Sequence, residues 1–195
     1  MPDNSLKTLI QENKGVLFFL LRFLGAFSAL SLMYAIWVES FGDQADSFSW
    51  FVGKNLNFLF AGKLKLDQLE GHAAIAVDYN GSTAVSLFEG CNGMAVMILF
   101  FAFVFAFKGR WGDLVWFVPF GLIVIHLFNL ARLALLIQMA ANNSPLFHFM
   151  HKYLFSLIIY AAVFGLWIIW VKRASRFVKQ LKTKKQTIPT EGSDE

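Results

Sequence analysis

Cys91 is the single cysteine of the chain and its candidate nucleophile. It lies in the stretch FEGCNG, residues 88–93, where two glycines bracket the thiol just before an apolar run. Glycines permit a sharp turn, and the free N–H groups at a helix start favour a thiolate. The alternative is a buried structural cysteine, the commoner role of a lone thiol. A single cysteine excludes an intramolecular disulfide and a cysteine-rich metal site.

Arg132 and His151 are the candidate fixed cation and the candidate general base. Arg132 lies inside the apolar segment 111–141, where an ionisable side chain is expensive and therefore a functional candidate. Asn129, three residues earlier, shares its helix face. The structural alternatives stay open at this point: Arg132 snorkels to the membrane surface or pairs with Glu89. An interfacial histidine without partners is more often a polar rim residue than a base.

The composition is that of a membrane protein. Of the 195 residues, 57% are hydrophobic and 15% are charged, so a soluble domain could not hide the apolar surface. The net charge of +4 does not indicate nucleic-acid binding, because the basic residues concentrate in the C-terminal tail, directly after an apolar run. We find no phosphate-binding loop, paired carboxylates or metal-ligand cluster, and we expect neither a metal nor a cofactor.

Four apolar segments are candidates to span a bilayer, which takes about 20 apolar residues each. We predict an all-α polytopic membrane protein with spans at 16–38, 87–107, 111–141 and 151–171. Flanking lysines and arginines place residues 1–15 and the basic, partly disordered tail 172–195 in the cytoplasm. The first span is expected to be an uncleaved signal anchor.

Residues 39–86 are predicted to form a small loop domain on the outer face. Residues 48–60 are apolar but short and interrupted by polar residues, which favours an interfacial amphipathic helix over a fifth span. An Asn-Gly pair at 80–81 is typical of a tight turn, so the alternating stretches 73–77 and 84–88 are predicted to form a β-hairpin.

Helical rise places the three candidates at one depth. At about 1.5 Å per residue, Arg132 and His151 lie about 31 Å from the inner boundary, and Cys91 about 25 Å. Three separate segments thus bring a nucleophile, a cation and a possible base within about 6 Å of one level, at the outer boundary. His126 is about 9 Å deeper than Arg132, and we interpret it as a satisfied interior histidine. Arg22 is expected to snorkel to the cytoplasmic headgroups.

At these residues the chain resembles the exosortase and archaeosortase family, specifically its short exosortase F-like branch. The resemblance covers about residues 75–171 and is carried by EGCNG at 89–93, by NLAR at 129–132, and by His151 at the start of the last apolar helix. It implies a cysteine protease and transpeptidase in the bacterial inner membrane, with its active site facing the periplasm. Such an enzyme cuts the C-terminal sorting tail of exported proteins and transfers them through a thioester to an acceptor.

The resemblance assigns a role to each candidate. Cys91 is then the nucleophile, Arg132 the oxyanion stabiliser and His151 the proton carrier. The supporting residues are Glu89, Asn92, Gly93, Asn129 and His148. The implied partners are the lipid bilayer, an unspecified acceptor, and a membrane-anchored target ending in a short motif, a transmembrane helix and a basic cluster. The alternative is a non-enzymatic multi-pass membrane assembly factor or transporter subunit.

Overall fold

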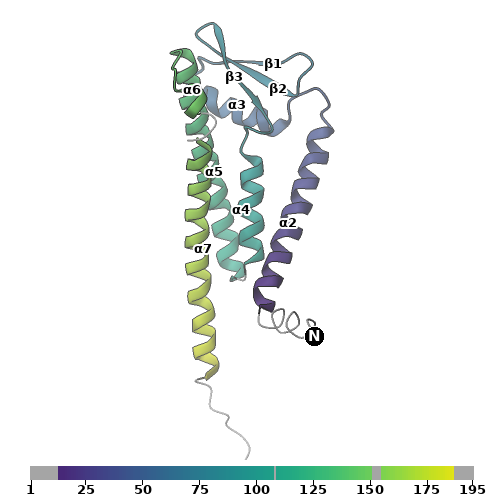
Figure 1. Cartoon of the computed structure of the whole chain (residues 1–195), viewed down its shortest axis with the longest axis vertical. Coiled ribbons are helices and arrows are strands. Elements are labelled where there is room, and N and C mark those ends of the chain that lie inside the picture. The colour runs from purple at the N-terminus through teal and green to yellow at the C-terminus, as the bar shows by residue number, and fades with distance from the viewer. Residues whose placement is uncertain (1–12, 108, 151–154, 187–195) are drawn as a thin grey trace, which may run out of the picture.

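The computed structural model describes residues 13–107, 109–150 and 155–186, without the side chains of 148, 155–156 and 177–186. Long helices stand side by side, and a small sheet with one crossing helix covers one end of them (Figure 1). We call this the sheet end and the opposite one the far end. The elements are α2 (Lys14–Glu39), α3 (Ser47–Leu59), β1 (Lys65–Gln68), β2 (Ala74–Tyr79), β3 (Ser82–Phe88), α4 (Met94–Ala106), α5 (Trp111–Ala141), α6 (Phe147–Phe149) and α7 (Phe155–Gln186).

Among the described residues, three helices are long and apolar enough to cross a membrane: α2, α5 and the part of α7 at Leu157–Arg176. Large apolar side chains such as Leu32, Met33 and Trp116 are exposed on α2 and α5. Such a surface suits lipid rather than water. The predicted spans at 16–38 and 111–141 therefore correspond to helices of the expected length, and the fold is that of a membrane-embedded protein.

The predicted span at 87–107 is not shown, because the helix there is short. Leu87 and Phe88 belong to β3, and α4 begins only at Met94. With 13 residues, α4 is about 20 Å long, less than the roughly 30 Å thickness of a bilayer's hydrocarbon core. The prediction joined strand and helix because a continuous apolar run does not distinguish a buried strand from a buried helix.

Helix α7 continues well beyond the predicted boundary at 171 and ends at Gln186. Residues 172–186 contain no glycine or proline, so nothing in the backbone stops the helix where the chain turns basic. The predicted start of this span, at 151, lies outside the described residues. The start of α2 and the end of α7 are both at the far end (Figure 1).

The connection after α2 folds into α3 and a three-stranded antiparallel sheet of order β1-β2-β3. The predicted hairpin is confirmed: Asn80 and Gly81 have φ values of +55° and +85°, and β2 pairs with β3 on either side of them. Strand β1 was not predicted, since four residues are too few to show an alternating pattern. Helix α3 lies across the ends of the long helices, beneath the sheet, and does not run beside them as a fifth span (Figure 1).

Two apolar cores hold these elements together. The first lies under the sheet and joins Val52 and Leu56 of α3 and Ile75 of β2 to Leu133 of α5. Cys91 belongs to it as well. The second lies between α4, α5 and α7 and includes Phe100, Val163 and Trp170. In this second core the helices approach closely, because a Cβ on Gly121 of α5 would overlap the ring of Phe100.

Candidate active site at the sheet end

Cys91 lies in the turn that connects β3 to α4. Its backbone N–H donates to the carbonyl of Phe88 at 2.8 Å, which closes the turn. The side chain is only 7% exposed and is a free thiol, while Glu89 and Gly90 of the same turn are exposed. The thiol therefore faces the protein core rather than the open side of the turn.

Asn129 connects this turn to α5. Its side chain is fully buried, and its Nδ2 donates to the backbone carbonyl of Cys91 at 3.1 Å. Gly93 makes the close approach possible: its φ is +88°, and a Cβ there would come within 3.1 Å of Asn129 Cγ. A side chain at position 93 would thus be strained and crowded. Because Arg132 lies nearly one helical turn after Asn129, this contact brings the Cys91 turn to the helix that bears Arg132.

Asn92 connects the same turn to α2 and α3. Its Nδ2 donates to Tyr34 Oη at 2.9 Å and to Ser49 Oγ at 3.1 Å, and its Oδ1 accepts from the backbone N–H of Met94 at 2.9 Å. Ser49 in turn donates to the carboxylate of Asp46, the N-cap residue of α3. We call Tyr34, Asp46, Ser49 and Asn92 the buried polar network.

The sequence prediction missed three members of this network. Asp46 and Ser49 do carry a local signal, since an aspartate before an apolar helical run is a typical N-cap. Tyr34 carries none, because it is one polar tip inside an apolar span. Its partner lies far away along the chain, and only the fold brings the two together.

The pKa of the Cys91 thiol is raised above its usual value. Burial is the main cause; the positive charge of Arg132 lowers the pKa, and the negative charge of Glu89 raises it. The sequence pattern predicted the opposite, a thiolate at a helix start. The difference arises because burial of the thiol outweighs the favourable charge of Arg132; in addition, α4 begins only at Met94, whose N–H is already bonded to Asn92. Burial thus favours the neutral thiol of Cys91, and the guanidinium of Arg132 opposes this effect.

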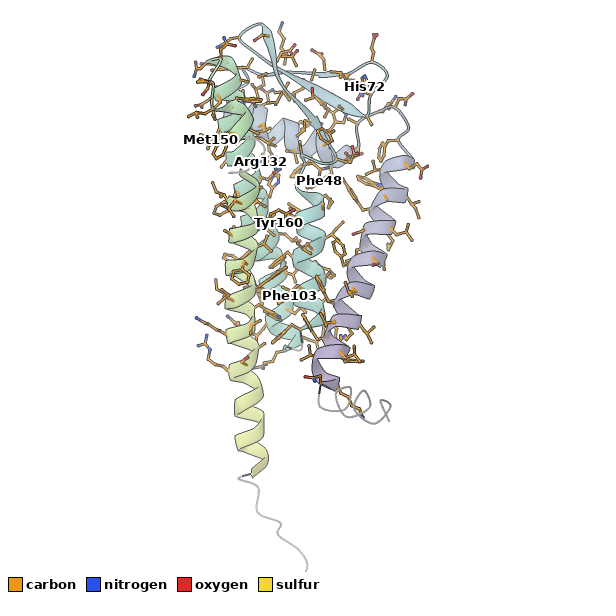
Figure 2. The ribbon with its side chains drawn as sticks, viewed as in Figure 1. Phe48, His72, Phe103, Arg132, Met150 and Tyr160 are labelled. Atoms are coloured by element: carbon orange, nitrogen blue, oxygen red, sulfur yellow. The ribbon has the colours of Figure 1, made fainter. Side chains whose placement is uncertain are left out.

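Arg132 lies below the sheet, at about the level of Phe48 on the crossing helix (Figure 2). Its Nε is buried and has no hydrogen-bond partner in the described part of the chain, and the same holds for Oδ1 of Asn129. Arg132 and Glu89 do not form an ion pair within the described ranges, where the pair observed joins Arg173 and Asp113. The alternative prediction of an Arg132–Glu89 pair is thus not met.

The histidine predictions have different outcomes. His151 lies outside the described residues, as does the side chain of His148, so the roles predicted for both histidines stay predictions. His126 was interpreted as a satisfied interior residue, and this is wrong, because its buried Nδ1 has no hydrogen-bond partner among the described residues. Its ring packs on the rings of Phe48 and Phe51, which offer no acceptor.

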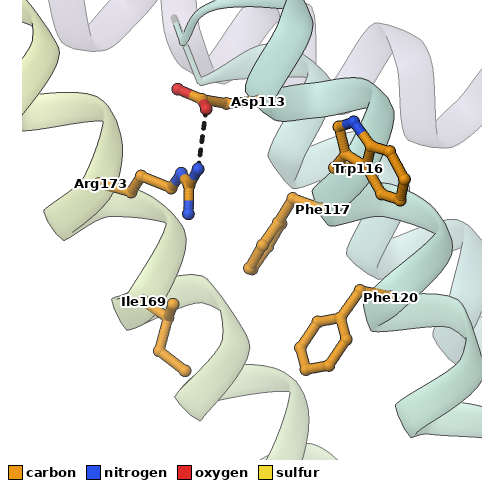
Figure 3. A pocket seen from close by; sticks show the side chains of 6 residues that line it. All are labelled: Asp113, Trp116, Phe117, Phe120, Ile169 and Arg173. Atoms are coloured by element: carbon orange, nitrogen blue, oxygen red, sulfur yellow. Dashed lines mark hydrogen bonds and ion pairs between the residues drawn. The ribbon is translucent and has the colours of Figure 1, made fainter.

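A cleft of about 330 Å³ opens at the far end, between α5 and α7 (Figure 3). Its lining consists of Asp113, Trp116, Phe117, Phe120, Ile169 and Arg173. Arg173 Nη2 contacts Asp113 Oδ1 at 2.9 Å. Neither a thiol nor a histidine is among these described lining residues. Nowhere in the described part of the chain do three metal-ligating side chains cluster.

Comparisons of the chain with models of known families, with curated proteins and with solved structures give no match. The function is therefore inferred from the residues of the site.

Proposed function

We propose that this protein is a membrane-embedded cysteine transpeptidase similar to the exosortases, with Cys91, Arg132 and His151 as its catalytic residues. The observation that carries the proposal is the buried Nε–H of Arg132, which has no partner in the described residues although it lies on the helix that holds the Cys91 turn. A buried donor without a partner costs about 1–3 kcal/mol. Such groups need an explanation, and a substrate oxygen is the explanation that also accounts for the thiol.

Asn129 provides a second polar group that a peptide substrate could bind. Its buried Oδ1 is an acceptor without a partner among the described residues, nearly one turn from the donor on Arg132. A peptide group offers one acceptor and one donor. A substrate backbone can therefore satisfy both residues, its carbonyl at Arg132 and an N–H at Asn129.

The proposed reaction has two acyl-transfer steps. His151 takes the thiol proton as Cys91 Sγ attacks the scissile carbonyl carbon, and the oxyanion accepts a hydrogen bond from Arg132. The C–N bond then breaks, the leaving amine receives the proton from His151, and the target remains bound as a thioester. An acceptor nucleophile, deprotonated by His151, attacks the thioester and breaks the C–S bond, which returns the thiol.

The raised pKa of Cys91 means that a base is needed to deprotonate the thiol. Because burial keeps the thiol neutral, attack requires that a base remove the proton when the substrate is bound. Arg132 lowers the pKa and so favours the thiolate as it forms. A resting thiol that is buried and protonated is also protected from oxidation and from unselective acylation, since the thiolate is the reactive form.

The proposed substrate is an exported protein held in the membrane by its own C-terminal helix and basic cluster. With the sheet end at the periplasmic face of the bacterial inner membrane, the basic residues of the far end lie in the cytoplasm. Those with described side chains include Lys14, Arg110, Lys172, Arg173 and Arg176. A target helix inserted in the same direction presents its scissile peptide at the level of Cys91, so that the membrane supplies orientation.

The non-enzymatic alternative, an assembly factor or transporter subunit, is less well supported. It treats Arg132 and Glu89 as a structural pair, and the two do not form an ion pair in the described part of the chain. It also does not explain why the buried Nε of Arg132 and Oδ1 of Asn129 have no hydrogen-bond partner among the described residues.

Cleavage of a target protein tests the proposal. The target, from the same genome, ends in a transmembrane helix and a basic cluster and is co-expressed with wild type, Cys91→Ala or Cys91→Ser. Both substitutions remove the thiolate, and full-length target should accumulate while the enzyme stays at its normal level. Ser86→Ala, an exposed change on β3, is the matched control and should cleave normally. Normal cleavage by Cys91→Ala would favour the non-enzymatic alternative.

A further inference from the structure

Arg22 is a charged side chain inside the apolar helix α2. It lies about 12 Å along the helix axis from Lys14, within the candidate span. Its guanidinium carbon is 5.6 Å from the ring centroid of Phe18 and 5.4 Å from that of Phe105 on α4. The side chain is therefore held against the contact between α2 and α4 by two aromatic rings.

A cavity of about 230 Å³ lies beside this guanidinium. It is lined by Arg22, Phe105, Phe107, Gly109, Trp111 and Leu114. The cavity thus sits where α4 ends and α5 begins, at the far end of the bundle. Among the described residues, the lining combines the positive charge of Arg22 with aromatic and aliphatic walls and includes no carboxylate.

The chain does not provide a counter-ion for Arg22 within the described ranges. Arg22 forms neither an ion pair nor a hydrogen bond there, and Asp113, in the first turn of the adjacent α5, is paired with Arg173 at 2.9 Å. A partly buried guanidinium among apolar side chains requires an anion, because its desolvation is otherwise uncompensated. The start of α5 at Trp111 adds the positive end of a long helix beside the same cavity.

We infer that this cavity binds the phosphate group of an anionic membrane phospholipid. The occupant is a lipid rather than a dissolved anion because the cavity is bordered by exposed apolar side chains. Phe18 is 55% exposed and Trp111 is 73% exposed, and both offer surface for acyl chains. The phosphate accepts charge-assisted hydrogen bonds from the guanidinium of Arg22. An anionic headgroup is preferred because the described lining residues include a guanidinium and no acidic side chain that could bind a cationic headgroup.

Lipid retention by the purified full-length protein tests this site. The protein is incubated in detergent with phosphatidylglycerol, and bound lipid is counted by native mass spectrometry. Loss of a charge-assisted pair predicts roughly tenfold weaker retention in Arg22→Gln. The matched control is Arg176→Gln, which removes the same charge from an exposed position of α7 outside the cavity and should retain lipid like the wild type. Equal retention in both variants would overturn the site.

Two further measurements distinguish the sources of the phosphate. Inorganic phosphate at the same concentration should not displace phosphatidylglycerol, and phosphatidylcholine should be retained more weakly. Displacement by inorganic phosphate, or equal retention of the two lipids, would contradict an anionic-lipid site. If Arg22→Gln fails to fold, Leu114→Trp serves as a second test. It fills the cavity while Arg22 stays in place, and it should also reduce lipid retention. These readouts do not depend on target cleavage.

Discussion

The side-chain amide of Asn129 donates a hydrogen bond of 3.1 Å to the backbone carbonyl of Cys91. Through this bond the Cys91 turn is attached to α5, while Asn92 attaches the same turn to α2 and α3. Arg132 follows nearly one turn later on α5, so a single rigid helix sets the position of the cation relative to the thiol. Preorganisation of this kind is what an acyl-transfer site requires.

Substitution of Asn129 should therefore make the Cys91 turn more mobile. Asn129→Ala leaves the Cys91 carbonyl without its donor, and we expect alkylation of Cys91 to become several-fold faster while target cleavage falls at least about tenfold. Gln138→Ala, an exposed change on the same helix, is the matched control and should alter neither. Unchanged alkylation and cleavage in Asn129→Ala would show that the bond does not position the nucleophile.

The alkylation rate of Cys91 should depend on pH in a manner set by its two charged neighbours. Iodoacetamide reacts with the thiolate. Because the pKa of Cys91 is raised, the alkylation rate should increase only at a pH above the ordinary thiol pKa of about 8.5. Glu89→Gln removes a negative charge and should shift the profile to lower pH. Arg132→Gln removes a positive charge and should shift it to higher pH. Shifts in the same direction, or none, would contradict this electrostatic arrangement.

The buried polar network should contribute measurably to stability. Asn92→Ala removes three hydrogen bonds at once, those to Tyr34 Oη, Ser49 Oγ and the Met94 N–H, and each buried group left unsatisfied costs about 1–3 kcal/mol. Tyr34→Phe removes one hydrogen bond and should cost about 1 kcal/mol. Unfolding in mixed micelles by increasing sodium dodecyl sulfate measures both. A smaller effect in Asn92→Ala than in Tyr34→Phe would show that the network is not the anchor of the turn.

The long helices could be predicted from the sequence because uninterrupted apolar runs mark them directly. Helix α5 has the predicted bounds, and α2 differs from its prediction by two residues at the start and one at the end. The start of α4 could not be predicted in this way, because it depends on Asn92 capping Met94 and on the left-handed backbone of Gly93. Neither this hydrogen bond nor this backbone conformation can be predicted from apolar content alone.

The candidate site was predictable in part for a similar reason. Helical rise indicated that Cys91 and Arg132 share a level, and Arg132 does lie close enough to affect the Cys91 pKa. Depth does not reveal which way a side chain points, so the bond from Asn129 to the Cys91 carbonyl was not foreseen. The raised thiol pKa was missed because burial under the sheet depends on contacts between distant segments.

Arg132→Lys separates the catalytic role of this residue from a structural one. Lysine keeps the charge but lacks the planar fork of donors, so the oxyanion role predicts a loss of about a hundredfold or more in cleavage rate at a normal protein level. Target cleavage and protein level are measured together in Arg132→Lys, Arg132→Ala and Glu89→Gln. Near-normal cleavage by Arg132→Lys would contradict the oxyanion role, and loss of the protein in both Arg132 variants would favour a structural role.

In the proposed reaction Cys91 is acylated by its target, and mass spectrometry can detect this covalent adduct. The wild-type protein is incubated with the target, quenched in acid and digested, and the peptide that contains Cys91 is analysed. We expect a thioester between Cys91 Sγ and the new C-terminus of the cleaved target, released by hydroxylamine and missing in Cys91→Ala. Target cleavage by the Cys91→Ala protein, with no adduct on the wild type, would contradict it.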